Sequence, residues 1–233
     1  MKLAIFDVDG TLVNIHKIEE DCFVRTFAEE FGIVRINCNW SEYIHVTEPG
    51  IVSQIFQEKL GRIPSDKDFL TIKKHFLKLL QKACETHPNL FFEIPGSAKV
   101  ISQLKVDSDW SIAIATGSWR DPALFKLEKA DIEITGIPFV SGDDEFSREA
   151  IVKASIEKAK NLYQIENFKK IVSIGDGIWD IKTAAKLGIS FVGIAKGREA
   201  EKLLNLGCDR VVENFARITD FKQMLETATI PRI

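Results

Sequence analysis

The sequence lacks several features that would place it in common classes of protein. No uninterrupted apolar run approaches the ~18 residues that a membrane-spanning helix needs. Lys and Arg number 31 against 34 Asp and Glu, and they form no basic stripe, so no nucleic-acid partner is expected. The four cysteines are scattered without a CxxC pair, which argues against a disulfide framework or a zinc site. Internal repeats and low-complexity tracts are also missing.

What is present is the composition of an ordinary folded chain, with 45% apolar and 28% charged residues. That apolar content is enough to offset the entropy lost on folding. The N-terminal segment reaches Asp7 almost at once, which is too short for a signal peptide. We therefore expect a cytoplasmic protein with reduced thiols and no membrane partner. The sequence does not indicate an oligomeric state.

Short apolar runs alternate with helical stretches along most of the chain. The runs show no polar alternation, which is typical of strands buried on both faces of a parallel sheet. We expect such strands at residues 2–6, 111–115, 170–174, 190–195 and, more weakly, 210–212. Helices are expected at residues 97–105, from an N-cap at Asp121 to about residue 130, and from an N-cap at Ser147 to about residue 162. The alternation predicts an α/β fold, a Rossmann-like parallel sheet with helices on both faces.

Residues 14–95 interrupt this alternation, because no convincing buried strand appears among them. Instead, three apolar stripes with helical spacing follow one another, and Ser65 with Asp68 indicates the start of the third helix. A loop of this length would be unusual inside one compact domain. We therefore expect two domains, an α/β core formed by residues 1–13 and 96–233 and a small helical domain formed by residues 14–95.

The first predicted strand runs directly into the sequence DVDGT at residues 7–11. Ligand sites in α/β folds lie at the carboxyl ends of strands, and a strand would place Asp7 and Asp9 on the same side. Two carboxylates held this close repel each other, so the site requires a cation or a shared proton. Gly10 permits the turn that brings the backbone close to a ligand.

Two other predicted strands end in polar residues. One runs into Thr116, Gly117 and Ser118, whose hydroxyl and N–H groups can bind phosphate, although such residues are also common in ordinary turns. The other runs into GDGIWD at residues 175–180, which places Asp176 at the strand end and Asp180 one helical turn later. Carboxylate oxygens suit Mg²⁺, although the second motif could also be a simple helix N-cap.

Taken together, these motifs resemble the haloacid dehalogenase (HAD) superfamily of phosphohydrolases, in order, spacing and strand context along the whole chain. The helical segment after DVDGT resembles the C1 type of cap in that superfamily. The resemblance implies that Asp7 is the nucleophile that forms an aspartyl-phosphate and that Asp9 is the general acid and base. It also implies that Thr116, Gly117 and Ser118 bind the phosphoryl oxygens.

The resemblance further implies a Mg²⁺ ion held by Asp7, the backbone carbonyl of Asp9, and Asp176, with Asp180 as a ligand or as an anchor for one. The superfamily also places a lysine or arginine between the second and last motifs, often before a proline. No Lys-Pro pair occurs in this chain. We favour Arg148, at the start of a predicted helix, as the catalytic and phosphate-binding cation, and keep Lys153 as the alternative.

The predicted function is the Mg²⁺-dependent hydrolysis of a small phosphorylated metabolite. A sugar-phosphate phosphomutase remains the alternative, because it would use the same residues. A phosphonate-cleaving relative would need a cap lysine that forms a Schiff base, and the sequence does not identify one. A regulatory phospho-receiver is less favoured, because a receiver carries its acceptor Asp on a later strand and has no helical insertion after the first. A non-catalytic binding protein is also less favoured, because both Asp7 and Asp9 are present.

Overall fold

The computed structural model describes the backbone of all 233 residues and every side chain except that of His16. A six-stranded sheet forms the centre, in the order β5-β4-β1-β6-β7-β8, and all its pairings are parallel. The strands are β1 (Lys2–Phe6), β4 (Trp110–Ala115), β5 (Phe139–Val140), β6 (Ile171–Gly175), β7 (Ser190–Ile194) and β8 (Val211–Val212). The five predicted strands are confirmed to within one residue, whereas the two-residue β5 was not predicted.

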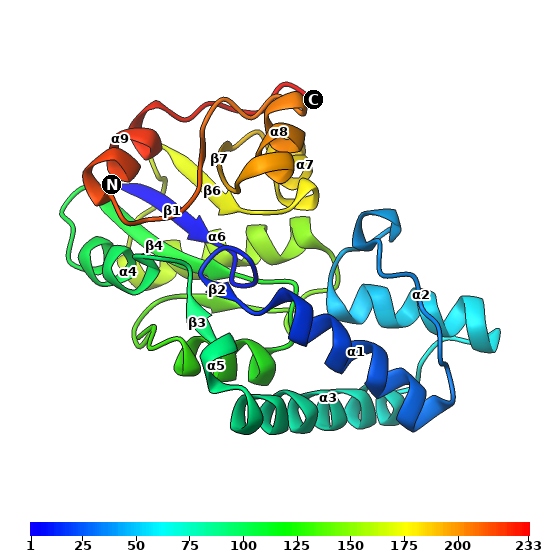
Figure 1. Ribbon diagram of the computed structural model, residues 1–233. Coiled ribbons are helices and arrows are strands. Elements are labelled where there is room, and N and C mark those ends of the chain that lie inside the picture. The colour runs from blue at the N-terminus through cyan, green and yellow to red at the C-terminus, as the bar shows by residue number, and fades with distance from the viewer.

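Helices cover both faces of this sheet, as the Rossmann-like prediction requires (Figure 1). Along β1, Ala4 and Phe6 face one side, where they pack with α4 (Ser97–Lys105), α5 (Arg120–Lys129) and α9 (Ile218–Thr227). Leu3 and Ile5 face the other side, with α6 (Arg148–Tyr163), α7 (Ile178–Leu187) and α8 (Gly197–Asn205). Both faces of the central strand are therefore buried, which explains its uninterrupted apolar sequence.

The predicted start of α5 is wrong. The helix begins at Arg120 with Trp119 as its N-cap, and Pro122 lies within the first turn, where its missing N–H group is tolerated. The reason lies outside the local sequence. The Trp119 N–H donates to the carboxylate of Glu48 at 2.6 Å, and the Arg120 N–H donates to that of Asp143 at 2.7 Å. Carboxylates from distant segments therefore satisfy donors that a local cap would otherwise bind.

Three helices follow the first strand, α1 (His16–Phe31), α2 (Glu48–Leu60) and α3 (Asp66–Thr86), and α3 lies against α5 of the α/β part. We call residues 14–95 the helical insertion. The short strands β2 (Val13–Asn14) and β3 (Phe92–Glu93) pair in antiparallel fashion where the chain leaves and re-enters the α/β part. The helical insertion also contains single 3₁₀ turns at Trp40–Glu42 and Pro88–Leu90.

The aromatic stripes of the insertion form its interior. Phe23 packs edge-on against Phe27 and Phe76, with ring centroids 5.2 and 5.5 Å apart, and all three side chains are buried. The predicted capping box of α3 is present, because Ser65 accepts the N–H of Asp68 at 3.3 Å while Asp68 accepts that of Ser65 at 2.8 Å. Among the described residues, no helix combines the length and hydropathy of a membrane span.

Candidate active site

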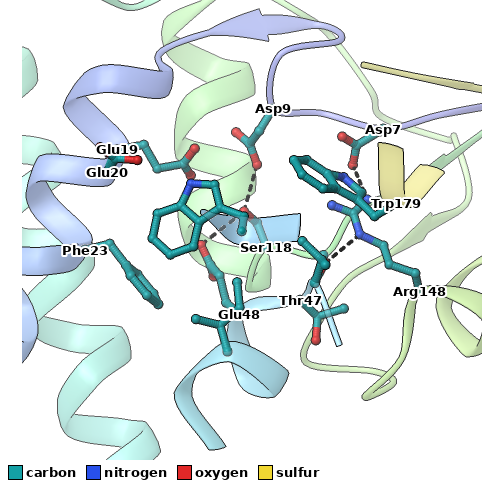
Figure 2. A pocket seen from close by; sticks show the side chains of 14 residues that line it. Asp7, Asp9, Glu19, Glu20, Phe23, Thr47, Glu48, Ser118, Arg148 and Trp179 are labelled. Atoms are coloured by element: carbon teal, nitrogen blue, oxygen red, sulfur yellow. Dashed lines mark hydrogen bonds and ion pairs between the residues drawn. The ribbon is translucent and has the colours of Figure 1, made fainter. Parts of the chain in front are cut away.

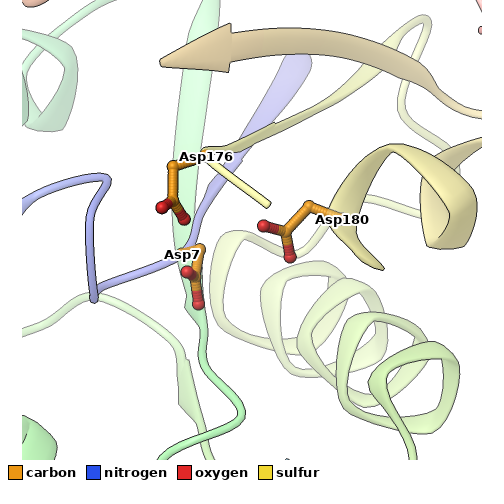
Figure 3. Close-up of side chains that lie close together, drawn as sticks. All are labelled: Asp7, Asp176 and Asp180. Carbon is orange, nitrogen blue, oxygen red and sulfur yellow. The ribbon is translucent and has the colours of Figure 1, made fainter. Parts of the chain in front are cut away.

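Three carboxylates meet at the carboxyl end of the sheet. Asp7 follows β1, Asp176 follows β6, and Asp180 lies in the first turn of α7. One oxygen from each lies within 4.8 Å of the others, and Figure 3 shows the three side chains gathered together. β1 and β6 pair with Phe6 opposite Ile174, so the residues that follow these strands emerge side by side. The structure thus brings together three of the residues that were predicted to bind a metal.

Arg148 supplies the cation beside these carboxylates. It is the first residue of α6, and its Nη1 lies 3.0 Å from Asp7 Oδ1 and 3.0 Å from Asp180 Oδ1. Lys153, the alternative in the sequence, is exposed one and a half turns further along the same helix. The structure therefore brings the guanidinium of Arg148 to the carboxylates, and it leaves the ammonium of Lys153 in solvent.

The electrostatics of this cluster fit a divalent cation. Burial raises the pKa of Asp7 well above its ordinary value and that of Asp180 to about 6, although Arg148 opposes both shifts. One guanidinium faces three carboxylates, so a buried excess of negative charge remains. Carboxylate oxygens are the ligands that hard cations such as Mg²⁺ prefer. A bound Mg²⁺ would offset the excess with the donor set that is present.

A second cluster of charges surrounds Lys126 on α5, whose side chain is fully buried. The Lys126 Nζ lies 2.6 Å from Asp9 Oδ1 and donates to the Ser118 hydroxyl at 3.0 Å. It also forms an ion pair with Glu19, on α1 of the insertion. The Ser118 hydroxyl in turn donates to Asp9 Oδ2 at 2.8 Å. The Asp9 side chain therefore belongs to this second cluster, and its backbone carbonyl is left as the predicted metal ligand.

Glu48 joins the second cluster from the insertion. It is the first residue of α2, where Thr47 caps the helix by accepting the Gly50 N–H at 3.1 Å. The Glu48 carboxylate accepts the Trp119 N–H and lies 3.1 Å from the Ser118 hydroxyl. Burial raises the pKa of Glu48 to about 8, against the opposing effect of the neighbouring Lys126 charge.

The loop after β4 joins the two clusters. Thr116 is buried, and its hydroxyl accepts the Ser118 N–H at 3.1 Å. A Cβ atom on Gly117 would come within 2.9 Å of Arg148 Nε and 3.0 Å of the Val46 carbonyl oxygen. The Arg148 Nε donates to the same carbonyl at 2.8 Å, so these two groups are held together beside residue 117. Only glycine fits there, because any Cβ atom would collide with both groups. The predicted phosphate loop thus lies between the core cation and the insertion.

Both clusters border one cavity of about 160 Å³ (Figure 2). The core contributes Asp7, Asp9, Gly117, Ser118, Arg148 and Trp179 to its wall. The insertion contributes mainly carboxylates and large apolar side chains, namely Glu19, Glu20, Glu48, Phe23, Trp40 and Ile51. Figure 2 shows Asp7, Arg148 and Trp179 on one side and Glu19, Glu20 and Phe23 on the other. The cavity therefore has a wall from each part of the chain.

Lys126, Glu19 and Glu48 were not predicted from the sequence as site residues. For Lys126 a signal does exist, because it lies between Ala123 and Leu127 on the buried stripe of α5, where an apolar residue is expected. Glu19 and Glu48 look like ordinary residues near helix starts, and only the docking of the insertion brings them to the site.

Comparison with known proteins gives a family match and similar folds. The profile of the family described as haloacid dehalogenase-like hydrolase matches residues 4–194. A hydrolase from Pseudomonas syringae has a similar structure, with a TM-score of 0.73 and 18% identity, covering 98% of this chain and 100% of that one.

Two curated proteins are similar in sequence. Phosphonoacetaldehyde hydrolase from Bordetella pertussis is 23% identical over 214 residues, which cover 86% of this chain and 70% of that protein. Glycerol-1-phosphate phosphohydrolase 1 from Saccharomyces cerevisiae is 24% identical over 245 aligned residues, which cover 99% of this chain and 89% of that protein.

Proposed function

The chain belongs to the haloacid dehalogenase-like hydrolase family, and on this basis we propose that it is a Mg²⁺-dependent phosphatase of small phosphomonoesters. The observation that carries the proposal is the convergence of Asp7, Asp176 and Asp180 beside a cavity that Asp9 also lines. The similarity to a yeast glycerol-1-phosphate phosphohydrolase supports the same reaction. In this proposal, residues 14–95 act as a cap that encloses the substrate against the core.

The reaction requires two displacements at phosphorus. An Asp7 carboxylate oxygen attacks phosphorus, the bond from phosphorus to the alcohol oxygen breaks, and Asp9 gives its proton to that oxygen. Water then attacks the aspartyl-phosphate, gives a proton to Asp9, and releases phosphate while Asp7 is restored. Mg²⁺, when bound, would offset the repulsion between the Asp7 carboxylate and the anionic substrate. Arg148, Thr116 and the loop N–H groups would hold the phosphoryl oxygens.

Cleavage of a phosphonate, the reaction named for the Bordetella relative, has less support. Such a reaction would need a neutral lysine from the cap to form a Schiff base. Among the described residues that line the cavity, none is a lysine. The nearby Lys126 belongs to a core helix, and its carboxylate partners raise its pKa above the ordinary value, despite its burial, so that it stays charged. Asp9, in contrast, supplies the acid that an alcohol leaving group requires.

The size and charge of the cavity restrict the alcohol. A cavity of about 160 Å³ is similar in size to an engineered cavity of about 150 Å³ that binds one benzene molecule. The wall beyond Asp9 carries Glu19 and Glu20 and includes no cation other than Arg148 among its described residues. A compact neutral or cationic alcohol is therefore expected to bind better than a carboxylate.

The proposal is tested by phosphate release from three matched substrates, 2-aminoethyl, 2-hydroxyethyl and carboxymethyl phosphate. We expect Mg²⁺-dependent turnover, with kcat/KM lowest for the carboxymethyl compound. Phosphonoacetaldehyde and an aldose 1-phosphate are assayed in parallel, for aldehyde release and for isomerisation. Turnover of either compound, without phosphate release from any monoester, would replace the proposed function with that reaction.

A further inference from the structure

Lys126 is a buried charge that the proposed reaction does not use directly. A lysine ammonium has three N–H donors, and Asp9, Ser118 and Glu19 provide three acceptors around it. Burial acts to lower the pKa of Lys126, but the carboxylates of Asp9, Glu19 and Glu48 outweigh it and raise this pKa. An ammonium in this position would be strongly destabilising without those partners. The buried ammonium therefore depends on these acceptors.

The partners of Lys126 come from both parts of the chain. Asp9 and Ser118 belong to the core, on the segments that follow β1 and β4. Glu19 belongs to α1 of the insertion. The ammonium therefore has its full set of acceptors only while the insertion is docked against the core.

The contacts of Asp9 show what Lys126 holds in place. Asp9 Oδ1 faces the Lys126 ammonium at 2.6 Å, and Asp9 Oδ2 accepts the Ser118 hydroxyl at 2.8 Å. Because both oxygens are held, the carboxyl group has one orientation in the wall of the cavity, and the proton that it gives to the leaving oxygen must lie on a remaining lone pair of one of these two oxygens. A general acid must lie within hydrogen-bond reach of the leaving oxygen, so this orientation affects the rate of proton transfer.

We propose that Lys126 is a positioning residue for Asp9 and that its pairing with Glu19 couples docking of the insertion to the orientation of the general acid. This proposal rests on the proposed function. An undocked insertion would remove Glu19 and leave the ammonium with its core partners alone. Proton transfer would then be impaired although Asp7 and its neighbouring carboxylates stay unchanged.

The test compares Lys126→Met and Lys126→Arg with Lys129→Met, an exposed control on the same helix. Lys126→Met should lower the rate of the phosphorylation step on the order of 10- to 100-fold for 2-hydroxyethyl phosphate. The loss should be at most about threefold for 4-nitrophenyl phosphate, whose leaving group needs little protonation. Lys126→Arg should restore part of the alkyl rate, and Lys129→Met should match the wild type.

A double-mutant cycle with Asp9→Asn separates positioning from a general structural effect. If Lys126 acts through Asp9, Lys126→Met adds no further loss in the Asp9→Asn background. Equal losses for alkyl and aryl substrates, or losses that multiply in the double variant, would overturn the proposal.

Two further measurements keep the proposal separate from folding and from the proposed function. Glu19→Gln leaves the ammonium in place, so it serves if Lys126→Met does not fold. Relative to the wild type, it should lower the alkyl rate by a larger factor than the aryl rate, and equal losses for the two substrates would contradict the coupling. Crystal structures of wild type and of Lys126→Met, or of Glu19→Gln if Lys126→Met does not fold, report the Asp9 orientation without any assay. A wild type inactive on every monoester would refute the proposed function, whereas an unchanged Asp9 orientation would refute the positioning role.

Discussion

Two buried acidic clusters border the same cavity, and they balance their charge in different ways. In the metal cluster, Asp7, Asp176 and Asp180 face the single guanidinium of Arg148 at the end of the sheet. In the lysine cluster, Asp9 and Glu19 pair with the ammonium of Lys126, and the Glu48 carboxyl group lies beside them. Each contains three carboxyl groups and one cation, yet only the first groups three carboxylate oxygens within metal-binding distance.

The difference lies in where the acids come from. All residues of the metal cluster belong to the core, and their positions follow from two strand ends and two helix starts. The lysine cluster takes two of its carboxyl groups from the insertion. The three carboxylates of the first can therefore gather without the insertion, which contacts that cluster through the hydrogen bond that Arg148 Nε donates to the Val46 carbonyl, whereas the second is complete only when the insertion is docked. Substitutions in each cluster should thus have different kinetic signatures.

The largest effect is expected from Asp7→Asn, which removes the nucleophile from the metal cluster. Turnover should fall on the order of 10⁴-fold or more, because no other group replaces an attacking carboxylate. Rapid-quench experiments with ³²P-labelled substrate should show a labelled protein for the wild type and none for the variant. A labelled Asp7→Asn protein would move the nucleophile to another residue.

Removal of the metal should have the next largest effect. With EDTA, hydrolysis should fall at least about 100-fold, because the unshielded carboxylates repel the substrate phosphate. Excess Mg²⁺ should restore the rate, and the charge-conserving variant Glu85→Gln/Lys99→Gln, at two exposed positions, should respond as the wild type does. Full activity in metal-free buffer would mean that Arg148 alone offsets the negative charge of the carboxylates in the metal cluster.

Asp9→Asn tests the lysine cluster while the nucleophile stays in place. The phosphorylation step should slow about 10²- to 10⁴-fold for an alkyl phosphate and much less for 4-nitrophenyl phosphate. Water attack on the aspartyl-phosphate should remain slow, so stopped-flow traces should show a burst of nitrophenol followed by a slow phase. Equal losses for both substrates would leave Asp9 with a structural or metal-binding role only.

The cation of the metal cluster should matter more than its neighbour on the same helix. Arg148→Ala should lower kcat/KM about 10- to 100-fold, because it removes charged hydrogen bonds worth about 1.5–3 kcal/mol. Lys153→Ala, at an exposed position on α6, should change it less than threefold. Steady-state kinetics of both variants provide the comparison. The reverse order would assign phosphate binding to Lys153.

The same contrast explains which parts could be predicted from sequence. Strands buried on both faces have uninterrupted apolar sequences, and Asp7, Asp176 and Arg148 stand at their ends or at a helix start, so local patterns locate them. Lys126 and Glu48 come together only through tertiary docking, which no local pattern encodes. The start of α5 was misplaced for the same reason, because Glu48 satisfies the Trp119 N–H.

The smallest expected effect concerns the stability of the docked arrangement at Glu48. Its pKa of about 8 in the folded protein lies above the ordinary value of 4.5, so the folded protein holds a proton that the unfolded chain releases. This contribution to stability is complete below pH 4.5 and is lost as the pH rises through 8. Between pH 6 and 7.5 it should fall by up to about 2 kcal/mol, at about 1.36 kcal/mol per pH unit.

Glu48→Gln has no such dependence, so urea unfolding should show the variant gaining stability relative to the wild type over that range. Glu58→Gln, at an exposed position on the same helix, should track the wild type. A constant difference between wild type and Glu48→Gln at both pH values would mean that Glu48 is already ionised beside Lys126, which would make the lysine cluster a fully charged one.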